Sequence, residues 1–341
     1  MTALRLVFLS VALLSLGLLG CDTTATQPEE QVVVEAYLQA DAPLPPIRLT
    51  RTVSVDETYD PDSPDGAVQN ADVVVERLDS DDTVAESVPY TPHDSVPGLY
   101  TPAGATVVQP QVTYRLRVTT DEGDEITSTT TVPGPVGVVK TENDTAVYQS
   151  EQQPAITVQS GQSNVVRDTQ NVFTFTTTSL LDFQNTPDTT LRKALTPFYA
   201  DGFDPKEDSL ESLRITSSGL LNEGNFERTD DGSITIALPW LAVAFFGPNE
   251  AAVNVVDKNY YDFLRSQSVQ QGGFAPGEIP NVIEHVEGGT GLFGSYAQAT
   301  NRVFITPPEQ FDPNRSKGRN DPTRKASPAK GTAASRPFPQ R

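Results

Sequence analysis

The chain has 341 residues, of which 45 are acidic and 24 are basic, and hydrophobic residues make up 37% of it. This length and composition predict about two globular domains with ordinary hydrophobic cores. The net charge of −21 argues against nucleic acid as a partner, because a phosphate backbone repels such a surface. One cysteine and two histidines exclude a disulfide scaffold and a classical zinc site.

The first twenty residues have the pattern of a signal peptide. An apolar run extends from Leu6 to Gly20 and spans only about 22 Å as a helix, less than the roughly 30 Å hydrocarbon core of a membrane. The run ends directly before Cys21 in the order Leu-Leu-Gly-Cys, which is typical of a bacterial lipobox. We therefore expect residues 1–20 to be removed and Cys21 to be acylated, since two or three acyl chains anchor a protein stably. The alternative is a plain secretory signal with a chance cysteine.

Residues 22–31 are polar and have no apolar periodicity, so they are predicted to form a tether between the lipid and the folded chain. Asp22 would favour the inner membrane under enterobacterial rules, which are not general. The predicted location is the cell envelope, at the outer membrane, with the periplasmic and the surface face both open.

Residues 32–134 have the pattern of a β-sandwich. The clearest signal is apolar alternation over residues 112–118, followed by an acidic turn with a glycine and a Thr-rich strand over 126–132. Alternation on both sides of such a turn predicts a hairpin. Further strands are predicted over 32–38, 47–55 and 71–78. Short strands with regular turns favour an immunoglobulin- or transthyretin-like sandwich.

Residues 138–308 are predicted to form a second, β-rich α+β domain with one or two short helices. Its expected strands cover 138–147, 155–158, 172–178, 234–237, 241–246, 252–256 and 302–306. Asp257 is a plausible N-cap for a helix from Lys258 to Ser268. The whole chain is therefore expected to be mostly β.

Residues 314–341 form a basic tail with a net charge of +7 on a chain whose total is −21. With one large apolar residue and four prolines, the tail is predicted to be disordered. It is either a solvated tail or an arm that touches anionic lipid, a cell-wall polymer or the acidic body. The acidic and Lys-poor composition of the whole chain favours a halophilic source.

Several short motifs occur in an order that identifies a family. These motifs are Val33–Leu38, Gly66–Val68, Ala71–Val73, Gly98–Tyr100, Tyr114–Leu116, Asn259–Leu264 and Val286–Gly294. Together with the lipobox, they make residues 18–306 resemble the Bacteroidota lipoprotein family catalogued as domain of unknown function 4249. His285 departs from the polar residue usual in that family, and the basic tail is an addition. The resemblance implies an envelope lipoprotein, often encoded beside a TonB-dependent outer-membrane receptor, and implies no activity or catalytic residue.

Two loops resemble ligand-binding motifs only in part. Asp60, Asp62 and Asp65 suggest a Ca²⁺ loop, but the third acid is displaced by one residue and the closing glutamate is absent. The alternative is a solvated acidic loop. The glycines of 288–294 superficially resemble a phosphate-binding loop without its Lys-Ser/Thr ending, so a β-turn that needs positive φ is the better prediction. Residues 230–232, Asp-Asp-Gly, are predicted to form a hairpin turn.

Both histidines stand next to acidic residues. The order His93-Asp94-Ser95 contains the residue types of a catalytic triad, but adjacency in sequence is no evidence for a triad. His285, beside Glu284 and Glu287, is either a local acid–base group or a surface histidine with carboxylate neighbours.

Trp240, Phe245 and Phe246 are the candidate aromatic ligand surface, with core packing as the favoured alternative. No nucleophile motif accompanies these residues. The sequence therefore predicts a non-enzymatic accessory lipoprotein without cofactors, which binds a partner such as a TonB-dependent receptor. The alternatives are an envelope hydrolase, with or without support from Ca²⁺, and a purely structural or adhesive lipoprotein.

Overall fold

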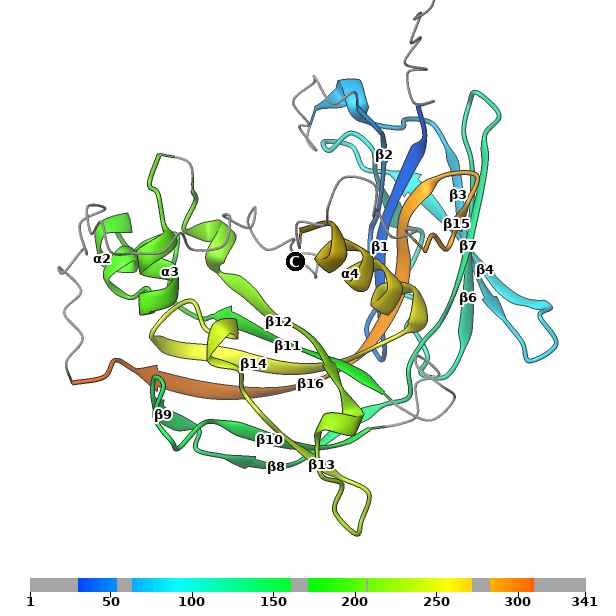
Figure 1. Ribbon diagram of the computed structural model, residues 1–341. Coiled ribbons are helices and arrows are strands. Elements are labelled where there is room, and N and C mark those ends of the chain that lie inside the picture. Colours follow the sequence, from blue (N-terminus) through cyan, green and yellow to red (C-terminus); the bar gives the residue numbers. More distant parts are fainter. Residues whose placement is uncertain (1–29, 54–62, 161–170, 207, 272–282, 310–341) are drawn as a thin grey trace, which may run out of the picture.

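The computed structural model describes residues 30–53, 63–160, 171–206, 208–271 and 283–309 (Figure 1). Cys21, Asp60 and Asp62 lie outside these ranges, as does the basic tail. The described residues form a mostly β protein, which confirms the predicted fold class. No helix in these ranges is long and apolar enough to cross a membrane.

The first unit is a sheet that curls around its own core. Its strands are β1 (Val32–Gln39), β2 (Ile47–Arg51), β3 (Asp72–Leu78), β4 (Val84–Pro92), β5 (Leu99–Pro102), β6 (Thr113–Thr119) and β7 (Glu125–Thr131). They pair in the order β1-β2-β5-β4-β3-β6-β7, and β7 then pairs with β15 (Val286–Glu287). Alternate residues such as Val34, Val75 and Leu116 point into the core and are fully buried, as the period of two in the sequence requires.

A single strand of 17 residues, β16 (Thr290–Thr306), connects the two units. Its first half pairs with β1 in parallel, from Val33 opposite Thr290 to Gln39 opposite Tyr296. Its second half pairs antiparallel with β14 (Gly247–Val256). Residues 286–296, which the sequence placed in the second unit, therefore hydrogen-bond with strands of the first.

Three glycines allow β16 and the turn before it to approach their neighbours. A Cβ atom would lie 2.0 Å from the Glu125 carbonyl oxygen at Gly288, 2.6 Å from that of Val32 at Gly289, and 2.2 Å from that of Val34 at Gly291. Gly288 and Gly291 also have positive φ, of 75° and 104°. The predicted β-turn is confirmed, and its glycines allow close contact between backbones.

The second unit packs a small sheet against the other end of the large one. The strands β12 (Ile215–Asn222), β11 (Val172–Ser179), β14 and β16 form one layer. β13 (Ile234–Ala237), β10 (Ala155–Ser160) and β8 (Val136–Glu142) form the other layer. Phe173, Phe175 and Val253 lie in the core between them. β9 (Thr145–Val147) adds a short parallel strand beside the end of β16.

Three α-helices are present in the described ranges: α2 (Asp188–Lys193), α3 (Pro197–Gly202) and α4 (Lys258–Gln271). The helix predicted from Lys258 is confirmed as α4, whereas α2 and α3 have only six residues each and too few turns for a periodic pattern. The 3₁₀ turns are η2 (Pro64–Gly66), η3 (Glu211–Leu213), η4 (Glu223–Asn225) and η5 (Trp240–Ala242).

Two predicted strands are wrong. Residues 241–246 do not form a strand, because the chain turns as η5 directly after Pro239 and then returns in one bridge between Leu195 and Phe245. Residues 138–147 do not form one strand, because Asn143 adopts φ 55° and separates β8 from β9. Such a left-handed residue interrupts a strand.

Candidate functional site

A buried polar cluster lies where the first turns of α4 meet β7, β16 and the residue before β15. We call it the α4 polar cluster. Its members are Thr130, Ser295, Asp257, Lys258, Asn259, Asp262 and His285. These residues come from elements far apart in the sequence, so the cluster is created by the fold.

Asp257 lies between β14 and α4 and caps the helix, as predicted. Its Oδ1 accepts the backbone N–H of Tyr260 at 2.9 Å, and its Oδ2 accepts the hydroxyl of Thr130 at 2.6 Å. The Thr130 hydroxyl also lies 2.7 Å from that of Ser295. Burial raises the pKa of the Asp257 carboxyl to about 6, against the hydrogen bonds that stabilise its ionised form. The carboxylate thus fastens the start of α4 to both β7 and β16.

Asn259 makes a second connection between α4 and the sheet. Its Nδ2 donates to the carbonyl oxygen of Thr129 at 2.8 Å and to that of Phe293 at 2.9 Å. One amide therefore binds the edge of β7 and the first half of β16 together. The Asn259 side chain therefore has a structural role, and because both of its amide hydrogens are used, neither is free for a ligand.

Asp262 is the partner of His285. The carboxylate is buried, with 3% of the side chain exposed, and its Oδ2 lies 2.8 Å from Nε2 of His285 and is also hydrogen-bonded to Lys258. The predicted neighbours of His285 are not its partners, because Glu284 accepts the hydroxyl of Thr290 instead. The sequence missed Asp262, and the only available signal was its place in the Asn259–Leu264 motif.

The Asp262–His285 pair is the one arrangement in the cluster with acid–base capability. A carboxylate that orients an imidazole can assist proton transfer, and 25% of the His285 side chain is exposed. Catalysis of acyl transfer also needs a nucleophile beside the imidazole. Among the described residues, the nearby Ser128 hydroxyl donates to the backbone carbonyl of His285, at 2.6 Å, and leaves the ring without a nucleophile.

The other candidates from the sequence do not join this cluster. His93 is exposed, and its Nδ1 accepts the backbone N–H of Ser95 at 3.2 Å, so the three residues form a local turn. Phe245 and Phe246 are buried, and Trp240 packs edge-on against Tyr148 with ring centroids 5.3 Å apart. The aromatic residues therefore belong to the cores, as the favoured alternative predicted.

Asp231 shows how an acidic sequence pattern forms a turn. Its carboxylate accepts the hydroxyls of Thr229 and Ser233 and the backbone N–H of Ser233. The Thr229 and Ser233 hydroxyls lower the pKa of Asp231 to about 2. Gly232 follows with φ 84°, so the predicted hairpin turn is confirmed.

The metal prediction rests on residues that the structure does not describe. The two aspartates 60 and 62 lie outside the described ranges, and of Asp65 only the backbone is described, within η2. Where the chain is described, no three histidine, cysteine or acidic side chains gather as metal ligands.

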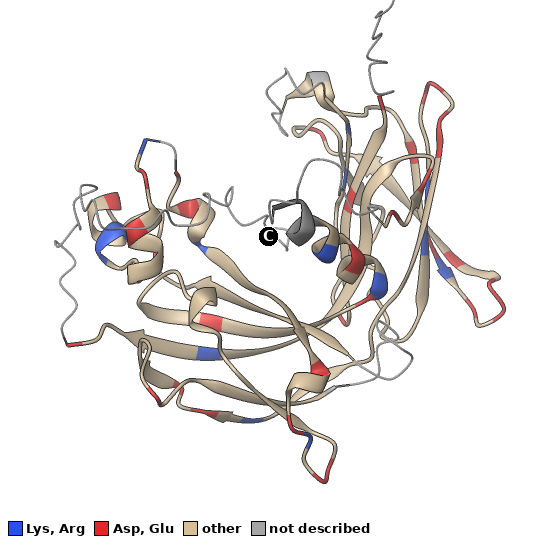
Figure 2. Cartoon of the chain, viewed as in Figure 1, with Lys and Arg blue, Asp and Glu red and all other residues tan. Residues whose placement is uncertain are grey.

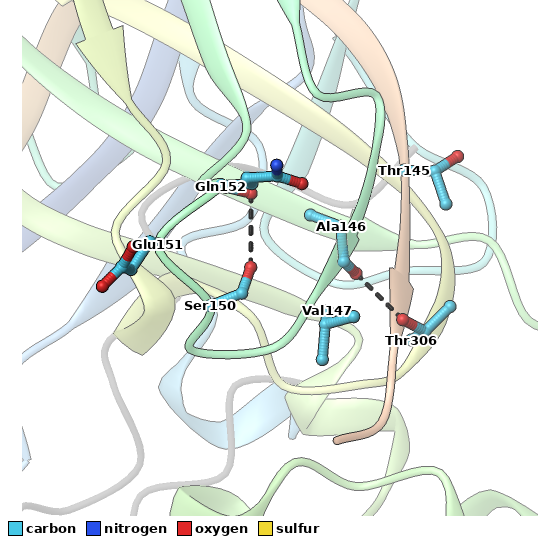
Figure 3. Close-up of a pocket in the computed structure, with 7 residues that line it drawn as sticks. All are labelled: Thr145, Ala146, Val147, Ser150, Glu151, Gln152 and Thr306. Atoms are coloured by element: carbon cyan, nitrogen blue, oxygen red, sulfur yellow. Dashed lines mark hydrogen bonds between the residues drawn. The ribbon is translucent and has the colours of Figure 1, made fainter. Parts of the chain in front are cut away.

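A shallow pocket of about 370 Å³ lies between β9, the turn after it and the end of β16 (Figure 3). Its walls carry Thr145, Val147, Gln152 and Thr306, together with Glu151 as the one charged side chain. The hydroxyls of Ser150 and Thr306 bind backbone carbonyls nearby. These groups are already engaged, and the pocket holds no acid–base pair.

Comparison with known proteins adds a family and distant structural similarities. The profile of the family described as domain of unknown function (DUF4249) matches residues 21–302. No curated protein matches the sequence.

Solved structures share little more than β-rich composition with the chain. Escherichia coli alpha-2-macroglobulin activated by porcine elastase is 8% identical, with 82% of this chain and 23% of that chain covered and a TM-score of 0.21. Salmonella alpha-2-macroglobulin reacted with methylamine is 11% identical, with 81% and 15% covered and a TM-score of 0.21. A tetra-tandem repeat of a large adhesion protein is 10% identical, with 81% and 48% covered and a TM-score of 0.20. The chain spans less than half the length of each, and at these scores no function transfers.

Proposed function

The chain belongs to the family described as domain of unknown function (DUF4249), and we propose that it is a lipid-anchored envelope protein that binds a partner or ligand without catalysing a reaction. Its anchor is the acylated Cys21, its location is the outer membrane, and its partner is a TonB-dependent receptor. The receptor is proposed from the family resemblance.

The observation that carries the proposal is how closely the lipobox precedes the folded body. Among the described residues, Glu30 approaches Arg51 at 3.7 Å, and the backbone N–H and carbonyl of Gln31 both bind Thr52. Eight residues lie between Cys21 and Glu30, and these nine chain steps can span at most about 30 Å. A lipid on Cys21 would therefore hold the sandwich close to a membrane, within reach of an integral partner.

The organisation of the polar residues supports binding over catalysis. Asp257 and Asn259 fasten α4 to the sheets, and Asp231 closes a turn. A rigid β scaffold that presents loops and sheet faces suits recognition of a partner.

Anchoring is tested by metabolic labelling with an alkyne fatty acid, followed by membrane fractionation. The wild type is expected to incorporate the label and to sediment with membranes. Cys21→Ser is expected to lose both properties while folding normally, because the substitution lies ahead of the described body. Labelling of Cys21→Ser, or an unlabelled wild type, would refute the anchor.

Receptor docking is tested by purifying the tagged, lipidated protein in mild detergent at high salt. A TonB-dependent barrel is expected in near-equal amount, and the matched control is the unlipidated Cys21→Ser protein added to the same membranes. Absence of any barrel from the lipidated sample would refute docking and leave a free-standing lipoprotein.

An envelope hydrolase is the second candidate, and the Asp262–His285 contact at 2.8 Å favours it. It predicts turnover on a panel of glycans and peptides that is lost in His285→Gln. Lys258→Met is the control, because it removes the other contact of Asp262 and leaves the imidazole. Activity that survives His285→Gln, or no turnover by the wild type, would refute this candidate.

A further inference from the structure

The large sheet of the second unit has a face that the small sheet does not cover. On β14 and β16 the odd-numbered residues, such as Val253 and Val303, point into the core beside the small sheet. The even-numbered residues therefore point the other way. We call this the outer face. Its members on the central strands are Pro248, Glu250, Ala252, Asn254, Gln298, Thr300, Arg302 and Phe304.

The named members of the outer face have no net charge, on a protein whose net charge is −21. The two charged members on these strands, Glu250 and Arg302, stand directly opposite each other in the β14–β16 register. Figure 2 shows that the acidic residues gather in turns and helices, whereas β11, β14 and β16 are mostly uncharged. The face therefore has no excess charge that would attract a charged ligand, and a ligand without charge meets mainly uncharged side chains there.

A chain of amide side chains crosses the outer face. Nε2 of Gln39 lies 3.4 Å from Oε1 of Gln298, whose Nε2 donates to Oδ1 of Asn254 at 2.8 Å. Asn254 is fully buried and donates in turn to the Thr174 carbonyl at 3.2 Å, and Tyr296 donates its hydroxyl to Gln39 at 3.1 Å. The chain of hydrogen bonds fixes the orientation of the two partly buried glutamines.

These glutamines keep hydrogen-bonding capacity toward the solvent. Each amide has two donor hydrogens and two acceptor lone pairs, and the hydrogen bonds described above use one of the hydrogens on each nitrogen. A ligand that binds them therefore meets groups whose rotamers are already ordered, which lowers the entropic cost of binding.

Apolar groups border the same face beyond the amides. Phe304 is 46% exposed and stands opposite Pro248, and Leu180, 39% exposed, binds the Pro248 carbonyl through its backbone N–H. Thr300, also exposed, lies between Gln298 and Phe304 on β16. Gln298 and Phe304 are six residues apart on one strand, which places them about 20 Å apart.

We propose that the outer face binds a neutral polysaccharide along β16. The ordered amides of Gln39 and Gln298 and the hydroxyl of Thr300 bind sugar hydroxyls, and the exposed ring of Phe304 packs against an apolar sugar face. The absence of net charge on the face selects against anionic chains. The proposal rests on the proposed binding role, but neither on lipidation nor on a receptor.

Affinity gel electrophoresis tests the proposal on the full chain carrying Cys21→Ser, with laminarin, dextran, soluble starch and galactomannan as neutral probes and alginate as the anionic probe. At least one neutral polysaccharide is expected to retard the protein. Phe304→Ala and Gln298→Ala are each expected to weaken that binding about tenfold. The matched control is Phe198→Ala, because Phe198 is 58% exposed on α3, outside the face. Its binding should equal that of the unsubstituted protein.

Several results would overturn the proposal. These are retardation by alginate alone, retardation by no probe, and binding that survives both substitutions on the face. Binding that appears only after residues 310–341 are deleted would show that the tail of the same chain occupies the face. A dimer that Phe304→Ala dissociates, without polysaccharide binding, would assign the face to a second copy. Receptor co-purification repeated with Phe304→Ala distinguishes failure of this proposal from failure of the proposed function. The receptor should still co-purify with this variant, because the proposed docking does not use the outer face.

Discussion

Substituting Gly291 by alanine tests the close approach of β16 to β1. The new Cβ would lie 2.2 Å from the Val34 carbonyl oxygen and 2.8 Å from its nitrogen, where ordinary contacts begin at 3.4 Å. Val34 cannot move away, because β1 is paired with β2 on one side and with β16 on the other. Alanine is also strained at φ 104°.

The two effects can be separated with other glycines. Gly104 has φ 120° but no atom within 4 Å of its Cβ position, so Gly104→Ala should cost only about 1 kcal/mol. Gly289 has no positive φ but its Cβ would lie 2.6 Å from the Val32 oxygen, so Gly289→Ala isolates the clash. Gly291→Ala combines both effects and should cost more than about 4 kcal/mol.

Urea unfolding followed by Trp240 fluorescence and circular dichroism measures these differences as shifts of the midpoint at constant slope. Gly66→Ala is the control without either effect and should change stability by less than about 1 kcal/mol. If Gly291→Ala and Gly289→Ala lose no more stability than Gly104→Ala, the strands do not approach as described. In that case the explanation of the glycine motif fails.

Three further predictions concern the cores and the buried charges. Burial raises the pKa of the Asp257 carboxyl from 3.8 to about 6, so its contribution to stability is fully present below pH 4 and falls by about 3 kcal/mol as the pH rises through 6. Asp257→Asn should abolish this part of the pH dependence, which urea unfolding at several pH values measures. The same dependence of unfolding free energy on pH in both proteins would contradict the prediction. Phe245→Ala should cost about 3–5 kcal/mol of stability and Phe198→Ala less than about 0.5 kcal/mol, because Phe245 is fully buried and Phe198 is 58% exposed. If the two variants unfold at similar urea midpoints, Trp240, Phe245 and Phe246 become candidates for a ligand site again. Glu76 is buried against Arg115 at 2.6 Å, so Glu76→Gln should cost about 1–3 kcal/mol, whereas Arg117→Gln should cost less than 1 kcal/mol because that guanidinium is 63% exposed.

The elements that could be predicted are those whose pattern is local. In β6 and β7 every second side chain is buried, β1 and β3 are rich in valine, and α4 follows a clear N-cap at Asp257. β4 could not be predicted from apolar alternation, because only Val88 and Tyr90 of its nine residues are buried. The polar remainder of that strand resembles a loop in sequence.

Only the end of the long strand β16, residues 302–306, was predicted, and its first part was missed for a different reason. The glycines of 288–294 predict a turn, and of these Gly288 lies in the turn, whereas Gly291 and Gly294 lie in β16. The strand is defined by its partner β1, which is more than 250 residues earlier in the chain. Pairing over such a separation leaves no periodic signal in either segment, and a glycine in a strand commonly marks a close approach of another backbone.

The candidate site was even less visible in the sequence. His285 is adjacent to Glu284 and Glu287, and adjacency suggested the wrong partners. Its actual partner, Asp262, is 23 residues away, and Asp257 binds Thr130 across 127 residues. Such contacts depend on how α4 packs against the sheets, and residue spacing alone contains no information about that packing.

Most of the motifs that identify the family can be assigned a structural task. Tyr100 donates its hydroxyl to the Val68 carbonyl at 2.9 Å and accepts the N–H of Ala71 at 3.0 Å, so three of the motifs meet at one buried hydroxyl. Asn259 links β7 and β16 through two hydrogen bonds, and the glycines of the last motif allow β16 to pair closely with β1. Residues that hold the fold can be common to proteins with different ligands.

The outer face contributes no residue to these motifs apart from its border with β1. Gln298, Thr300 and Phe304 follow the glycine motif on the same strand, so their positions are set by the fold while their identities are free to suit a ligand. Membership of the family therefore leaves the ligand undetermined. Substitutions on the outer face are the experiments that can identify the ligand without disturbing the scaffold.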